Sequence, residues 1–411
     1  MIIKLVAILF MSTLSFCANS NNAMNQFLLA AQTGLNEPTE ASDTRMNVVS
    51  SFLEEAQFRF NASEGNEFDA NALAQSYEIR VKPKAWGQRE IEENILDLRS
   101  NQQNHHYNVA LNTALKNRYL ILLSYLEQHN TTQYFFKLSN LATQEIRLIR
   151  REVMGEKFNT EKLLGAVKMF EQSKALTILN LTRLNALQSQ IAMPLDSAAS
   201  ILDHSAVANM VDFAYITDKL SSMNNPIPSM PDALGENLAV EMAQAKSELL
   251  KTKHQLGVNL LSFAYKDSHN DSMAFQLGIN IPLGTHFNKA ESQYELYAAK
   301  NQLGERVTKM TLSLTRIQKE IAWLAGEIKL ADTQIQRVQK YIEKEYIKTH
   351  PLLTITLRKE LIEHQKKRTD IQIKALKLYV DALAISGHLI QEPLRNWIQN
   401  GAPELMESGR R

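Results

Sequence analysis

The chain has 411 residues, of which 44% are hydrophobic and 22% are charged, and its formal net charge is +1. This balance argues against a nucleic-acid-binding protein, because a phosphate-binding surface requires an excess of basic residues. The sequence contains only 14 glycines and 10 prolines, which argues against a β-protein with many turns and favours long helices.

Residues 1–18 have the features of a secretory signal peptide. A lysine precedes an apolar segment from Leu5 to Phe16 that is too short to span a bilayer, and small and polar residues follow. Cys17 is the candidate for lipidation, but Phe16 is an unfavourable residue before a lipidated cysteine, and ordinary cleavage near Ser15 to Ala18 is the alternative. We therefore expect an exported protein.

Two pairs of amphipathic strands are expected, separated by about 200 residues, which indicates an internal repeat. The first pair covers about 56–62 and 74–83, and the second covers about 258–266 and 272–282. Apolar and polar residues alternate with the period of a strand, and a proline ends the second strand of each pair. After residue 18 no apolar run is long enough for a membrane-spanning helix, so any membrane insertion must use these strands.

The alternation assigns the strand residues to two faces. The residues expected to face lipid are Tyr77, Ile79, Val81, Phe263, Tyr265, Phe275 and Ile279. The residues expected to face a polar lumen are Glu78, Arg80 and Lys82. An ordinary sandwich, half-buried on one face, is the alternative, but only two strand pairs exist and an export signal accompanies them.

Each strand pair precedes a helical hairpin, at about 86–200 and about 284–387. The first helix of each would have about 65 residues and a length of roughly 100 Å. In the second hairpin, apolar residues recur at 3-4 spacing from Met310 to Ile342, the pattern of a coiled-coil seam. In the first hairpin, the polar stretch from Gln128 to Gln133 interrupts the seam, and we expect the helix to bend or loosen there.

The hairpins and strands define two repeats, residues 19–203 and 233–390. An inter-repeat linker, residues 204–232, separates them and contains three prolines close to its end. A short helix from Asp232 to Leu256 leads into the second strand pair, and residues 391–411 form a C-terminal tail.

This order of elements resembles that of the TolC-type outer membrane factors. Asn237 to Gly257 resembles the helix that precedes the barrel in that family, and Phe275-Gln-Leu-Gly-Ile-Asn-Ile-Pro-Leu283 resembles its strand ending in an apolar-Pro-Leu step. Arg151 stands four residues before Gly155, as in the family's tip pattern. At the second tip the sequence departs from the family, because Thr349 stands where glycine is usual.

The resemblance implies a mainly α fold with a small β part. Long antiparallel coiled-coil hairpins would accompany four strands, which each protomer of a homotrimer contributes to a 12-stranded transmembrane β-barrel. The implied function is passive export of solutes as the outer-membrane channel of a tripartite efflux or type I secretion system. The implied partners are a periplasmic adaptor protein, an inner-membrane pump and outer-membrane lipid, and the implied location is the outer membrane with a periplasmic helical part.

At the helical tips, the resemblance implies that Arg151, Gly155, Tyr346 and Thr349 contact the adaptor, with plain turn chemistry as the alternative. We expect no cofactor, metal, nucleic acid or enzymatic activity, because the histidines lack metal-site spacing and no phosphate-binding or nucleophile motif occurs. A periplasmic adaptor or a structural coiled-coil envelope protein is the alternative function. Drugs, metals and proteins stay equally open as cargo.

Overall fold

The computed structural model describes residues 24–32, 35, 52–64, 73–151, 159–192, 210–222, 230–253, 257–267, 272–280 and 287–401. The predicted signal peptide with Cys17, and Gly155 at the first tip, lie outside the described residues. The chain forms two compact units. Unit 1 comprises Met1–Asn36, Asn108–Met230 and Met310–Arg411, and unit 2 comprises Glu37–Tyr107 and Pro231–Lys309. Each unit therefore combines segments from both predicted repeats.

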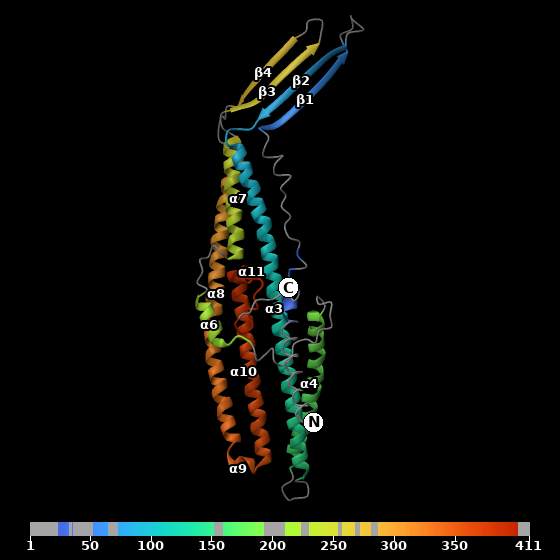
Figure 1. The fold of residues 1–411 in the computed structure, drawn as a ribbon, viewed down its shortest axis with the longest axis vertical. Helices are drawn as coiled ribbons and strands as arrows, with labels where there is room; N and C mark the ends of the chain where they lie inside the picture. The colour runs from blue at the N-terminus through green and yellow to red at the C-terminus, as the bar shows by residue number, and fades with distance from the viewer. Residues whose placement is uncertain are drawn as a thin grey trace, which may run out of the picture. The chain divides into compact units, whose positions relative to one another are not determined.

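Unit 2 contains a four-stranded antiparallel sheet with the order β1-β2-β3-β4 (Figure 1). The strands are β1 (Leu53–Glu64), β2 (Leu73–Pro83), β3 (Gly257–Asp267) and β4 (Ser272–Asn280). The two predicted strand pairs are thus confirmed, and they join into one sheet through β2 and β3. Among the described strands, β1 and β4 each have a neighbour on one side only, so the sheet has two open edges.

Two long helices, α3 (Gln88–Arg151) and α8 (Phe287–Ile342), contain 64 and 56 residues, respectively. In unit 2, α7 (Pro231–Lys253) packs against both. Leu238 and Ala245 of α7 form an apolar cluster with Ile95 and Leu98 of α3. On the α8 side, the hydroxyl of Ser292 donates a hydrogen bond to that of Ser247 over 3.3 Å, and both side chains are buried.

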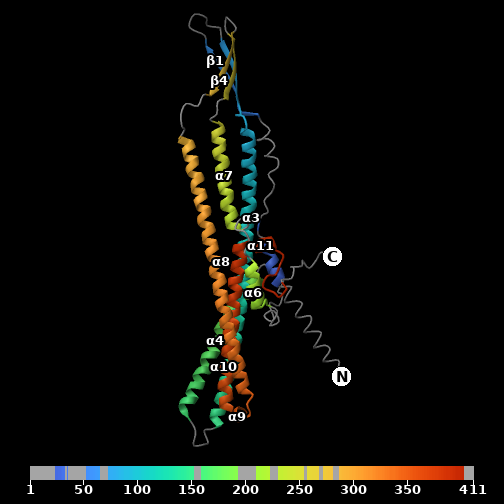
Figure 2. The ribbon, with the colours of Figure 1, turned by 90° about the vertical axis from the view of Figure 1, so that its left-hand side faces the viewer.

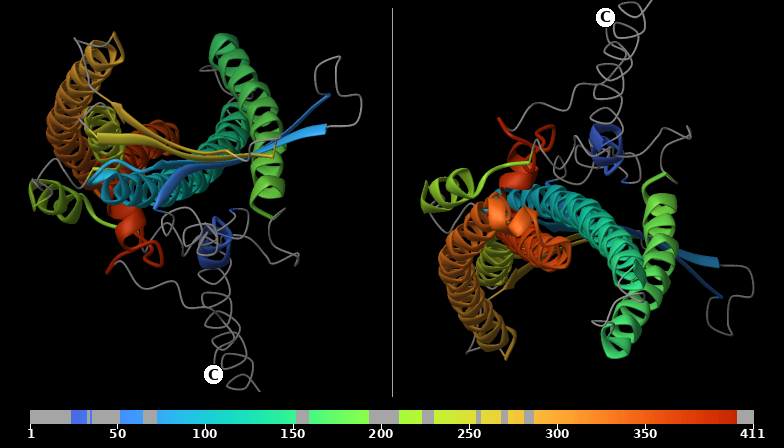
Figure 3. Two further views of the ribbon diagram at one scale, coloured as in Figure 1. Left: turned by 90° about the horizontal axis from the view of Figure 1, so that it is seen from above. Right: turned by 90° about the horizontal axis from the view of Figure 1, so that it is seen from below.

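In unit 1, four helices form a wall with the order α4-α3-α10-α8 (Figure 3). The outer members are α4 (Thr160–Ala192) and α8, and α10 (Pro351–Ser386) is the return helix of the second hairpin. The short helix α9 (Glu345–Lys348) connects α8 with α10 (Figure 2). The first and second repeats therefore meet along α3 and α10 in the middle of the wall.

The predicted seam of α8 is confirmed, because Ile321, Leu324 and Ala331 are each only 1% exposed. Leu324 packs with Ile371 and Ala375 of α10. Such 3-4 spacing places these side chains on one face of the helix, where they meet the antiparallel partner.

The polar stretch from Gln128 to Gln133 does not interrupt α3, because the helix is unbroken from Gln88 to Arg151. The polar stretch serves instead as a contact with α4. The Gln128 Nε2 donates to Asn180 Oδ1 over 2.6 Å and to the Asn180 carbonyl over 3.2 Å. A pair formed by the buried Asn180 and the half-buried Gln128 replaces two apolar side chains at this step of the seam.

The segments expected as linker and tail contain regular structure and buried side chains. The inter-repeat segment includes α6 (Phe213–Ser222), and the C-terminal segment begins within α11 (His388–Gln391). Trp397 is 1% exposed and its backbone N–H donates to the Tyr119 hydroxyl over 3.3 Å. A short helix at residues 24–29 is tied to the same region, since Arg118 donates to the carbonyls of Phe27 and Ala30.

Candidate functional site

The register of the sheet places the residues of each face in rows that cross all four strands. In the central row, Phe58 pairs with Ile79, Ile79 with Phe263, and Phe263 with Phe275. Directly opposed residues of antiparallel strands share a face, so these four side chains lie on the same side of the sheet. All four are exposed, by 46–71%.

Two neighbouring rows continue this apolar face. One is Phe60, Tyr77, Tyr265 and Met273, and the other is Ala56, Val81, Leu261 and Leu277. The structure therefore brings six of the seven residues expected to face lipid onto one surface. For the seventh, Ile279, it gives the backbone pairing with Val258. An apolar face this large and exposed marks a surface that meets lipid or another protein.

The opposite face is polar and carries paired charges. Glu78 lies opposite Arg59 in the register and forms an ion pair with Arg80 over 2.5 Å. At the helical end of the sheet, Glu54 pairs with Lys82 over 2.9 Å and with Lys253 over 3.0 Å. The three residues expected to face a lumen thus lie in a network of compensating charges.

The residues expected to face a lumen did not include Gln57, Arg59 and Gln276, which lie on the polar face as well. Gln57 pairs with Arg80, and Gln276 belongs to the same row through Ser262. The signal was present in the alternation around Phe58 and Phe60, which places Gln57 and Arg59 on the other face by the same period of two. Met273 and Leu277 share the face of Phe275 by the same alternation.

The wall of unit 1 is connected by ion pairs in which α10 contributes mainly the cation. Toward α3 the pairs are Lys359–Glu145, Lys377–Glu127 and Asp381–Lys116. Toward α8 they are Lys367–Glu327, Arg368–Asp332 and Lys374–Glu320. A partly exposed pair contributes about 0–1 kcal/mol, so these contacts fix the register of α10 between its neighbours more than they stabilise it.

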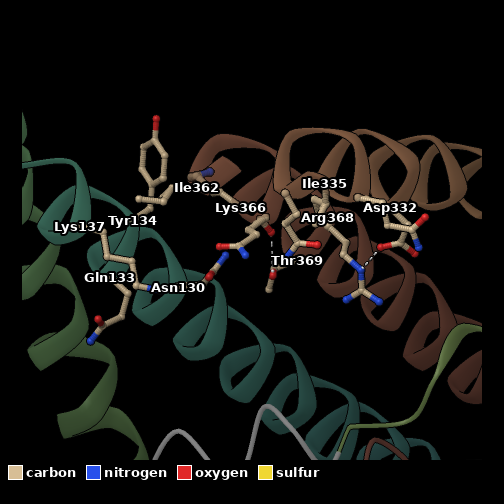
Figure 4. A pocket seen from close by; sticks show the side chains of 13 residues that line it. Asn130, Gln133, Tyr134, Lys137, Asp332, Ile335, Ile362, Lys366, Arg368 and Thr369 are labelled. Carbon is tan, nitrogen blue, oxygen red and sulfur yellow. Dashed lines mark hydrogen bonds and ion pairs between the residues drawn. The ribbon is translucent and has the colours of Figure 1, made fainter. Parts of the chain in front are cut away.

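A polar groove of about 710 Å³ lies between α3, α10 and α8 (Figure 4). Lys137 and Tyr134 of α3 line one side, and Asp332 of α8 lines the other, where it holds the Arg368 side chain at 2.5 Å. The remaining lining groups are mostly amides and hydroxyls. The groove offers hydrogen-bonding groups to a partner surface.

The second tip is a compact turn, in which Thr349 stands where the resemblance to outer membrane factors led us to expect a glycine. Thr349 ends α9 in a right-handed conformation, with φ −77° and ψ −9°, so no left-handed residue is needed. Its hydroxyl donates to the Tyr346 carbonyl over 2.8 Å, and the Tyr346 side chain is 58% exposed. Arg151 is the last residue of α3 and is also exposed.

The described helices include none with the length and apolar character that a membrane-spanning segment requires. Within the same residues, His, Cys, Asp and Glu side chains form no group of three or more that could hold a metal ion.

Neither protein-family models nor curated proteins match the sequence. Solved structures do match the fold. The outer membrane protein VceC from Vibrio cholerae has a TM-score of 0.64 at 12% identity, and the match covers 90% of this chain and 96% of that one. The chain has the fold of outer membrane channels. The CmeC outer membrane channel of Campylobacter jejuni matches with a TM-score of 0.59 at 9% identity, over 94% of this chain and 87% of that one.

The open state of the Neisseria gonorrhoeae MtrE outer membrane channel is similar too. It matches with a TM-score of 0.56 at 12% identity, over 90% of this chain and 88% of that one. The chain therefore shares the fold of these channels, with helical hairpins and a small antiparallel sheet, at low sequence identity.

Proposed function

We propose that this chain is the outer-membrane channel component of a tripartite efflux or type I secretion system, and that it exports solutes passively. It would act as a homotrimer in the outer membrane, with its helical part in the periplasm, and would catalyse no reaction. The observation that carries this proposal is the two-faced sheet with two open edges, in a chain that has the fold of outer membrane channels.

The open edges argue for closure by further copies. In lipid, each unsatisfied backbone N–H or C=O costs several kcal/mol, so a sheet with free edges cannot span a membrane. If β1 of one copy pairs with β4 of the next, rotational symmetry closes the ring and removes every edge. Three copies of four strands then give the twelve strands of one barrel. Ile79 and Phe263 would face lipid, and Glu78, Arg80 and Lys82 would face the lumen.

The outer helices of the wall support the same assembly. Both α4 and α8 expose large apolar side chains that isolated helices would not present to water. On α4 these are Leu164, Leu176, Ile178, Leu179 and Leu181, and on α8 they are Leu312, Trp323 and Leu330. Head-to-tail packing of copies would bury both sets.

The tips supply the contacts with the other components. Arg151 and Gly155 at the first tip, and Tyr346 and Thr349 at the second, would contact a periplasmic adaptor that connects the channel to an inner-membrane pump. Solute would enter between the tips and leave through the barrel. The paired charges of Glu78 and Arg80 favour neither cations nor anions as cargo.

Conductance across planar lipid bilayers tests this proposal. Purified full-length protein should give discrete, ohmic current steps, and native mass spectrometry in detergent should give the mass of three copies. A periplasmic adaptor or a structural coiled-coil protein would instead wash off membranes in carbonate and give no steps. A monomer without conductance would overturn the proposal.

A further inference from the structure

The middle of the polar face of the sheet carries two arginines and one glutamate. Arg59 of β1 lies directly opposite Glu78 of β2, so the two residues share a face. Arg80 lies opposite Gln57 in the next row. Side-chain contacts agree with this placement. Arg59 donates a hydrogen bond to Gln57 Oε1 over 3.2 Å, and Arg80 donates to Glu78 Oε1 over 2.5 Å.

Glu78 compensates only one of the two arginines. It forms its ion pair with Arg80, and the two side chains are only 18% and 34% exposed. Arg59 is exposed, and its hydrogen-bond partner Gln57 is uncharged. The arginine cluster, which consists of Arg59, Glu78 and Arg80, therefore keeps one positive charge, and that charge belongs to Arg59.

The charges at the helical end of the sheet cancel one another. There, Glu54 pairs with Lys82 over 2.9 Å and with Lys253 over 3.0 Å. Glu55 lies opposite Lys82 in the register and accepts a hydrogen bond from the Gln57 amide. Two carboxylates thus meet two ammonium groups. The surplus positive charge comes from the arginine cluster rather than from this end.

The strands on either side of the arginine cluster present uncharged residues to it. In the same rows, β3 contributes Ser262 and Ala264, and β4 contributes Ala274 and Gln276. In the proposed ring, β1 pairs with β4 of the next copy, so Arg59 would lie beside that strand. The sequence of β4 contains no charged residue. A neighbouring copy would therefore not compensate Arg59 through this strand.

Charges on the wall of such a barrel act across its whole lumen. Twelve strands spaced about 4.8 Å apart enclose a lumen with a radius on the order of 10 Å. The Debye length is also about 10 Å at 0.1 M salt, so the charge of Arg59 is felt near the axis. Rings of arginine or lysine select anions in pores, and a guanidinium group binds carboxylate or phosphate through two hydrogen bonds.

We propose that the barrel of the trimer favours anionic solutes, those with carboxylate or phosphate groups, and that Arg59 determines this preference. This inference rests on the proposed function, because it requires the polar face of the sheet to line a lumen. It adds the charge of the cargo, which the ion pair of Glu78 with Arg80 leaves open.

Reversal potentials in planar bilayers under a potassium chloride gradient test the preference. The full-length wild-type channel should be more permeable to chloride than to potassium. This preference should weaken between about 0.1 M and 1 M salt, because the Debye length falls to about 3 Å. Arg59→Gln should lower the permeability ratio to about one, and Glu78→Gln should raise it. Arg59→Lys is the matched control, since it keeps the charge and should keep the preference.

Three results would overturn the preference while leaving the channel intact. They are a conducting wild-type protein without preference for chloride, an R59Q channel with the wild-type ratio, and loss of the preference in R59K as well as in R59Q. Wild-type protein that gives no current steps would instead overturn the proposed function, and this inference with it.

Discussion

Ile79 of β2 and Phe263 of β3 are register partners, although they lie in different repeats of the sequence. Their pairing joins the two strand pairs into one sheet. It also fixes the faces, because a shift of one residue would turn every side chain of a strand to the other side. The apolar rows from Phe58 to Phe275 depend on this one alignment.

Two adjacent residues of β4 allow the two faces of the sheet to be tested separately. Phe275 and Gln276 are neighbours in sequence and lie on opposite faces. Phe275→Lys should destabilise the membrane-inserted protein by about 2–4 kcal/mol, because a charge would face lipid. Gln276→Lys should change stability little and should alter ion selectivity. Urea unfolding in vesicles measures the first effect and reversal potentials the second; equal destabilisation by both variants would contradict the assignment of faces.

The contact between α3 and α7 requires a glycine. A Cβ at Gly235 would lie 2.5 Å from Nε2 of the buried His105 ring. Gly235→Ala should therefore cost about 1–3 kcal/mol through overpacking, and adding His105→Ala should relieve part of this cost. Gly326→Ala in α8 is the control, since nothing lies within 4 Å of its Cβ. It should stabilise by up to about 1 kcal/mol from helix propensity, as thermal unfolding would show.

The same histidine makes stability depend on pH. Burial lowers the pKa of His105, the neighbouring His106 lowers it further, and Asp232 opposes them. The unfolded chain, with a histidine pKa of about 6.5, then binds the proton more readily than the folded chain. The free energy of unfolding should therefore be highest above that pH, and it should fall as the pH decreases below it.

His105→Gln should flatten this fall, and Asp232→Asn should steepen it, in chemical unfolding measured between pH 8 and pH 5. The pKa of His388 is lowered too, by burial and by Lys219, so His388→Gln serves as a comparison in unit 1. A pH profile unchanged in H105Q would show that His105 does not carry the dependence.

The amide contact between α3 and α4 should behave as a coupled pair. Asn180→Leu alone leaves the Gln128 amide without its partner and should cost about 1–3 kcal/mol. Changing both residues to leucine should restore an apolar seam and recover most of that loss. A double-mutant cycle on urea unfolding measures the coupling. Additive effects would mean that Gln128 and Asn180 do not interact.

Local periodicity predicted the strands and the seam of α8 well, because each depends on residues within one element. The sequence did not predict that α3 and α10 would meet, since α10 needs a second apolar side for that contact. Tyr379, which is fully buried and lies near Tyr119 of α3, belongs to that side, but it follows the main seam so closely that no separate stripe is visible. Trp397 was unpredictable for a similar reason, because its burial depends on contacts with distant Tyr119 and Lys219.

The functional residues also differ in whether a local pattern in the sequence predicts their positions. The alternation of polar and apolar residues is sufficient to place Tyr77 and Glu78 on opposite faces of β2. It could not place Trp86, which lies beyond the last strand residue, in a turn that Gly87 and Gln88 shape.

In the proposed trimer, β1 of one copy pairs with β4 of the next, and three copies close the ring. Cys17 is the only cysteine in the chain, so a Cys17→Ser background allows one cysteine at Gln57 in β1 and a second at Ala274, Gln276 or Gly278 in β4. Crosslinking with a short bismaleimide in membranes should give a ladder that ends at three covalently linked chains for at least one pair. A ladder that continues beyond three, or crosslinks within single chains only, would contradict the account.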